Sequence, residues 1–158
     1  MNAQSIFDAV PLGSLVRYSN GEPRPPARFS RKLKAWNNDN GVGRLVAREP
    51  ARDSASFRHP ASFTLHLGNY GSEGSIVMVV RRTYSVDSRL EFEVDEYSRP
   101  GDAHVLATAS GRDELLHIAS DRAAAERWLE ANRYAQARIE IVGSNPQAVP
   151  NGSGPCRR

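Results

Sequence analysis

The residues of this chain most able to bind another molecule are basic and lie close together near the N-terminus. The segment from Glu22 to Arg48 holds seven basic and two acidic side chains, a net charge of +5, whereas the whole chain carries only +3. Clustered cations of this kind attract the phosphates of nucleic acids or the carboxylates of acidic proteins. The seven candidate binding residues are Arg24, Arg28, Arg31, Lys32, Lys34, Arg44 and Arg48.

A helix from about Pro26 to about Asn38 is predicted to carry most of these cations. Phe29, Leu33 and Trp36 recur at i, i+4 and i+7, which places them on one face of that helix. We expect this face to pack on the sheet and Trp36 to anchor it there. The alternatives are that Phe29 or Trp36 is exposed and stacks on a nucleic-acid base, or that the basic face is only solvated.

Groups with catalytic or metal-binding chemistry show no recognised spacing. The four histidines do not recur at i+3 or i+4, and Cys156 has no second thiol to complete a zinc set. We therefore expect no metal, no cofactor and no catalytic residue. An enzyme whose site combines His66, His104 and nearby acids is the third and least favoured reading, and a pocket in which histidines and acids converge would support it.

The glycine-rich segment from Gly68 to Gly74 is interpreted as a hairpin loop with Tyr70 at its tip. It lacks the lysine of a phosphate-binding loop, and a strand rather than a helix is predicted to follow it.

Alternation of apolar and polar residues predicts the antiparallel sheet that must position the basic helix. The strand from Ser75 to Val86 begins with an apolar run and is therefore expected at the centre of the sheet. Asp87 and Ser88 are expected to turn this strand directly into the next. The predicted strands cover residues 15–18, 43–48, 62–67, 75–86, 89–95, 103–108, 114–119 and 137–142.

A second helix is predicted from the N-cap Ser120 through Arg133, with Ala124, Trp128 and Leu129 facing the core. Sheet and helices together predict one α+β domain over residues 1–142, with a mostly antiparallel β-sheet, two main helices and a disordered C-terminal tail. The tail, residues 143–158, has almost no apolar side chains to offset the entropy of ordering.

Composition narrows the class of protein. Of the 158 residues, 39% are hydrophobic and 25% charged, which is typical of a globular domain with a buried core. No apolar run approaches the roughly 20 residues that span a bilayer. The N-terminus also lacks the basic and apolar regions of a secretory signal. We expect a cytoplasmic protein without membrane contact.

A resemblance extends over Leu12–Gly21, Pro25–Trp36, Asn40–Val46, Phe63–Gly68 and Ser85–Ser88. These segments resemble small accessory proteins of broad-host-range conjugative plasmids, of the fertility-inhibition type. The resemblance implies a non-enzymatic protein that blocks transfer of a competing plasmid by binding part of the transfer machinery, such as a coupling ATPase or the relaxase–DNA complex. It assigns no functional residue.

We therefore expect a plasmid-encoded bacterial accessory protein that inhibits or modulates conjugative DNA transfer. It would bind a component of the transfer machinery through the basic N-terminal helix region. The alternative is a sequence-nonspecific nucleic-acid-binding module that uses the same basic face. The salt dependence of DNA binding separates the two.

Overall fold

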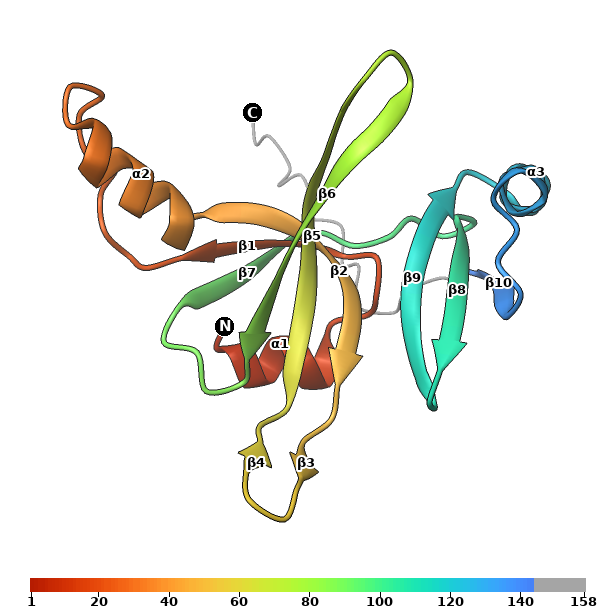
Figure 1. Cartoon of the computed structure of the whole chain (residues 1–158), viewed down its shortest axis with the longest axis horizontal. Helices are drawn as coiled ribbons and strands as arrows, with labels where there is room; N and C mark the ends of the chain where they lie inside the picture. Colours follow the sequence, from red (N-terminus) through yellow and green to blue (C-terminus); the bar gives the residue numbers. More distant parts are fainter. Residues whose placement is uncertain (144–158) are drawn as a thin grey trace, which may run out of the picture.

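A single strand, β2 (Gly41–Glu49), joins two parts of one eight-stranded antiparallel sheet in the computed structural model, which describes residues 1–143 (Figure 1). Arg44 lies between partners in β1 and β5, and Ala47 lies between partners in β9 and β5. One edge of β2 is therefore shared by β1 and β9, and the other edge pairs with β5. The strand order is β10-β8-β9-β2-β1-β7, with β5 pairing both β2 and β6.

The helices are α1 (Ala3–Ala9), α2 (Ser30–Asp39) and α3 (Arg122–Asn132). The other strands of the large sheet are β1 (Leu15–Ser19), β5 (Ser62–Ser72), β6 (Ser75–Ser85), β7 (Glu91–Glu96), β8 (Ala103–Ala109), β9 (Arg112–Ala119) and β10 (Ala137–Ile141). A separate two-stranded sheet pairs β3 (Arg52–Asp53) with β4 (Arg58–His59).

The first lobe consists of β1, β2, β5, β6, β7 and the helix α1. Its core contains an aromatic cluster in which Phe63, Tyr84 and Phe92 lie with ring centroids 5.3 to 5.9 Å apart. Helix α1 packs Ile6 into this core and is N-capped by Asn2, whose side-chain oxygen accepts a hydrogen bond from the Ser5 amide at 2.8 Å. Burial of these large side chains is the main stabilisation of the lobe.

The second lobe consists of β8, β9, β10 and α3, which lie together in Figure 1. Ala125 of α3 is fully buried against apolar residues of β8 and β9. The helix is capped by Asp121, whose carboxylate accepts a hydrogen bond from the Ala124 amide at 2.7 Å. The N-cap is therefore Asp121 and not Ser120.

A small apolar cluster holds the two lobes together. Val46 of β2 packs with Leu106 of β8 and Leu115 of β9. Beside this cluster, Arg81 of β6 forms an ion pair with Glu114 of β9, so both apolar contact and charge connect the lobes.

The α+β class and the mostly antiparallel sheet are confirmed, and helix α1 adds a third helix to the two that were expected. Two predictions about β6 are wrong. Within residues 1–143, β6 pairs only with β5, and its apolar run is exposed at Ile76, Met78 and Val79. The strand after Asp87 and Ser88 does not pair with β6 either, because β7 pairs with β1.

The glycine-rich segment also differs from its prediction. Strand β5 continues through Tyr70 to Ser72, and the turn is formed by Glu73 and Gly74, both with positive φ. This is the geometry of a two-residue hairpin turn, in which glycine is favoured.

The predicted disordered tail lies, apart from Gly143, outside the described residues. None of the helices formed by residues 1–143 has the length and apolar character needed to cross a membrane.

Candidate functional site

The basic N-terminal region forms a distinct arm, which we define as residues 20–39: a loop followed by α2. The arm is closed at its base by Asn40. The side-chain nitrogen of Asn40 donates to Asn20 Oδ1 at 3.0 Å and to the Trp36 carbonyl at 2.8 Å. Its side-chain oxygen accepts from the Ser19 hydroxyl at 2.8 Å. The two ends of the arm are thus held together at the rim of the first lobe.

Helix α2 begins at Ser30, four residues later than predicted. Phe29 occupies the N-cap and offers no side-chain hydrogen bond to the free amides of the first turn. Phe29 itself lies in a turn, because its amide donates to the Pro26 carbonyl at 3.0 Å. The segment after Pro26 is therefore a turn that leads into the helix.

The expectation that Trp36 anchors α2 on the sheet is wrong. No residue of α2 is buried, and Leu33 and Trp36 are only half-buried. The Trp36 indole donates to the Glu22 carbonyl at 2.8 Å and lines a small hollow with Pro23 and Pro25. Trp36 is thus covered by the arm's own loop, which closes the arm on itself.

The arm contacts the first lobe through β6 as well as through its base. Arg82 of β6 donates a hydrogen bond to the carbonyl of Asn38 at the end of α2. Contacts at the base of the arm and at the C-terminal end of α2 therefore hold the arm against the first lobe.

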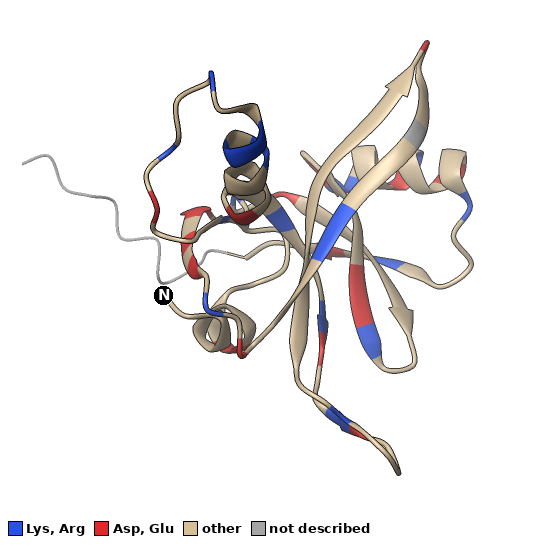
Figure 2. Ribbon diagram, turned by 60° about the vertical axis from the view of Figure 1, so that its left-hand side comes forward, with Lys and Arg blue, Asp and Glu red and all other residues tan. Residues whose placement is uncertain are grey.

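Five of the seven predicted binding residues lie together on the arm (Figure 2). All five are exposed. Among residues 1–143, none of these five lies within ion-pair distance of a carboxylate. Phe29 is 43% exposed, with Arg28 4.8 Å and Lys32 5.5 Å from its ring centre. The five cations are Arg24, Arg28, Arg31, Lys32 and Lys34.

Arg44 and Arg48 do not join the arm. Arg44 lies on β2, where its Nη1 donates to the Gly13 carbonyl at 2.6 Å and its side chain borders a cleft between the lobes. Arg48 is half-buried, and its Nε and Nη2 atoms have no hydrogen-bond partner among the described residues. Burial lowers the pKa of Arg48, and the Asp8 carboxylate opposes this shift.

Two of the four histidines, His66 and His104, share hydrogen bonds with neighbouring side chains. His66 lines the cleft and shares a 2.7 Å hydrogen bond with Asn69. His104 is buried and shares a 3.0 Å hydrogen bond with the hydroxyl of Ser98 on the cleft wall. Burial lowers the pKa of His104, although the carboxylates of Asp102 and Glu140 oppose this. Within residues 1–143, no three His, Cys, Asp or Glu side chains are grouped as a metal ion would require.

A row of stacked rings, which the sequence did not predict, lies on the side of the cleft formed by β9 and α3. His117 of β9 stacks on Trp128 of α3 with centroids 4.8 Å apart, and Tyr134 stacks on Trp128 at 5.7 Å. The signal that could have found it is the helical spacing of Trp128 with its half-buried neighbours, together with a histidine on a predicted strand. Neither feature shows in sequence that the two meet.

One family of conserved proteins matches the chain over residues 1–146, under the description "Uncharacterised conserved protein UCP036055". No curated protein and no solved structure shows a significant match.

Proposed function

The chain belongs to the UCP036055 family of uncharacterised conserved proteins, and we propose that it is a non-enzymatic accessory protein that binds an acidic macromolecule through the basic arm. The observation that carries the proposal is the arm's combination of exposed unpaired charge and absence of core contacts. An ordinary solvated surface mixes basic and acidic side chains, which reduces its field. Within residues 1–143 the arm's five cations have no carboxylate partner, and three of them lie on α2, a helix that buries no side chain.

The partner we propose is a protein of a conjugative transfer apparatus, such as a coupling ATPase or the relaxase–DNA complex. The resemblance of the segments around Leu12–Gly21 and Pro25–Trp36 to fertility-inhibition proteins supports this choice. In this proposal the protein is plasmid-encoded and cytoplasmic, and it inhibits or modulates DNA transfer by occupying an acidic surface of that partner. Charge complementarity would speed the encounter and select the partner.

Sequence-nonspecific binding of nucleic acid by the arm is the second candidate. The exposed ring of Phe29, flanked by Arg28 and Lys32, favours it, because an aromatic face among cations is the usual combination for contact with bases and phosphates.

The test is a triple charge reversal, Arg31→Glu, Lys32→Glu and Lys34→Glu, compared with a control triple that reverses three other exposed arginines. Arg89, Arg122 and Arg127 suit the control, because they are exposed and give the same change of net charge. The efficiency of conjugative transfer is measured in cells that express each protein. The arm triple should lose inhibition, and the control triple should retain it.

Salt dependence separates the two partners. If the arm binds DNA backbone, the affinity of the wild type should fall with salt at a log–log slope of about −3, as expected for three to four neutralised phosphates. If the arm binds a protein, DNA affinity should be weak at physiological salt and a partner should be captured by the wild type but not by the arm triple. Full inhibition together with unchanged DNA affinity in the arm triple would contradict both candidates.

A further inference from the structure

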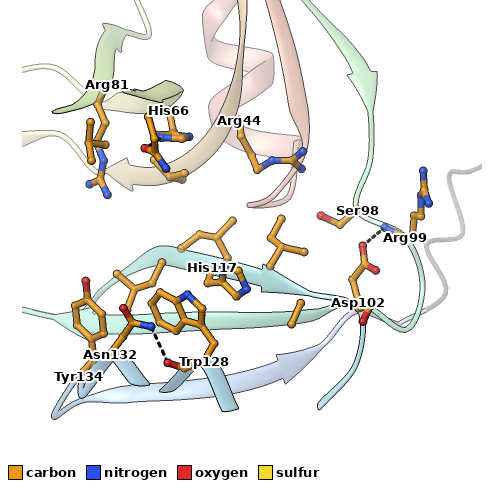
Figure 3. Close-up of a pocket in the computed structure, with 18 of the residues that line it drawn as sticks. Arg44, His66, Arg81, Ser98, Arg99, Asp102, His117, Trp128, Asn132 and Tyr134 are labelled. Carbon is orange, nitrogen blue, oxygen red and sulfur yellow. Dashed lines mark hydrogen bonds between the residues drawn. The ribbon is translucent and has the colours of Figure 1, made fainter. Parts of the chain in front are cut away.

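The cleft between the lobes has two walls of different chemistry (Figure 3). Its volume is about 830 Å³, within the range of roughly 300–1,000 Å³ typical of small-ligand sites. One wall comes from β2, β5 and β6, and the opposite wall comes from β9 and α3. The basic arm contributes no residue to the lining.

The wall from β9 and α3 is aromatic. The rings of His117 and Trp128 are nearly parallel, with an interplanar angle of 2°, and those of Trp128 and Tyr134 meet at 6°. Burial lowers the pKa of His117, which favours the neutral ring in this stack. Tyr134 is 50% exposed, so part of the row remains open to a further flat ring. Within α3, the Asn132 side chain donates a hydrogen bond to the Trp128 carbonyl at 2.8 Å.

The opposite wall is polar and partly cationic. Figure 3 shows Arg44, His66 and Arg81 on this side of the cleft, with the guanidinium of Arg44 directed toward Ser98. Arg81 is neutralised by its ion pair with Glu114. Arg44 donates one hydrogen bond, to the Gly13 carbonyl, and has no carboxylate within ion-pair distance among the described residues. Arg44 is therefore the cation most able to accept an anionic ligand.

The third side of the cleft carries both signs of charge. Arg99 lies 3.5 Å from the Glu96 carboxylate, and its backbone amide donates to Asp102 at 3.0 Å. These carboxylates repel an anion from this side. Arg44, which has no such carboxylate partner among the described residues, therefore offers an anion a stronger contact than Arg99 does.

We propose that the cleft binds a nucleotide unit, with its base stacked on the row formed by His117, Trp128 and Tyr134 and its phosphate held by Arg44. A planar π-system and an anion on the same ligand match the two facing walls, and stacking on an aromatic row accepts any base. An arginine without a carboxylate offers a charge-assisted, bidentate contact to phosphate. The nucleotide unit is either free or part of a single strand, and the experiment distinguishes the two.

The experiment uses the fluorescence of Trp128, which a base stacked on the neighbouring Tyr134 ring should quench. Trp36 is replaced by Phe to leave one tryptophan, and the arm triple reversal is included so that binding by the arm does not contribute. This protein is titrated with AMP, with adenosine and with a short oligo(dA) strand. We expect saturable quenching by AMP, by oligo(dA) or by both.

Two variants test which wall of the cleft contacts which part of the ligand. Arg44→Gln should weaken binding of AMP or oligo(dA) by about tenfold or more and leave adenosine almost unaffected, because only the phosphate contact is lost. Tyr134→Ala, at a half-exposed side chain that should tolerate truncation, should weaken binding of all three. Arg89→Gln serves as a control of equal charge change outside the cleft and should have no effect.

Quenching by AMP assigns the site to free nucleotides, and quenching by oligo(dA) alone assigns it to single strands. If neither ligand quenches Trp128 up to about 1 mM, the weak limit of specific binding, the proposal is overturned. Quenching that persists equally in Arg44→Gln and Tyr134→Ala overturns it as well. Because the arm is inactivated in this protein, failure here leaves the proposed function of the arm to its own test.

Discussion

Helices α2 and α3 each carry a tryptophan on an apolar face, yet the two helices are used in different ways. In α3 the fully buried Ala125 and the stacked Trp128 attach the helix to the second lobe. In α2 no residue is buried, and Trp36 closes the helix on its own loop. An apolar stripe on a helix predicts that some part of the protein will cover it, but does not say which part. Helix α3 is therefore part of the folded body, whereas α2 is the helix through which the proposed function would bind a partner.

The largest expected difference between the helices is the cost of removing their tryptophans. Trp128→Ala should lower the free energy of unfolding by about 3 kcal/mol, because it removes a large side chain from the apolar cluster of the second lobe. Trp36→Ala should lower it by less than about 1 kcal/mol, because the arm contributes little to the core. Urea unfolding followed by far-UV circular dichroism measures both. Equal losses in the two variants would show that α2 is part of the folded body.

Helix capping should show the same contrast at a smaller scale. Asp121→Ala removes the N-cap of α3 and should cost about 1 kcal/mol. Phe29→Ser supplies the side-chain cap that α2 lacks. It should raise the helicity of the arm and leave the global melting temperature unchanged, as amide hydrogen exchange of residues 30–39 and a thermal melt would show. A rise of several degrees in that temperature would contradict the independence of the arm.

Alternation and turn residues predicted the α+β class and most strands, because each strand with one buried face leaves a period of two in the sequence. The apolar run of β6 was misassigned to the centre of the sheet. Its length and apolarity do not distinguish a strand covered on both faces from one that exposes Ile76 and Met78. The turn at Asp87 and Ser88 was misread as a hairpin, because a short connection does not determine which strand edge is free.

The candidate site was predicted in part. The five cations of the arm lie close together in sequence, so local structure keeps them together. Arg44 and Arg48 are separated by a register shift in the pairing of β2 with β5, between Leu45 and Ala47. An extra residue at such a shift reverses the alternation of faces that follows it. The cleft depends on contacts between β2, β9 and α3, which are distant in sequence, and no local pattern reports them.

The smallest predicted effect is a pH dependence that acts on the lobe containing α3. Burial lowers the pKa of His104 from its ordinary 6.5. Below pH 6.5 the histidine is therefore protonated in the unfolded chain while it stays neutral in the folded protein. The free energy of unfolding should decline as the pH falls from 6.5 toward the lowered pKa. At neutral pH this histidine is uncharged in both states and causes no slope. His104→Asn should flatten the decline, measured by urea unfolding between pH 7 and pH 5, and an unchanged slope would assign it to other groups.

The most direct test of the division between the fold and the arm is removal of the arm. Residues 22–38 are replaced by a short Gly-Ser turn, which the contact between Asn20 and Asn40 allows because it brings the ends of the arm together. We predict a melting temperature within about 5 °C of the wild type and complete loss of inhibition of conjugative transfer. An unfolded product would show that the arm belongs to the core, and a folded product that still inhibits transfer would show that the arm is not the binding surface.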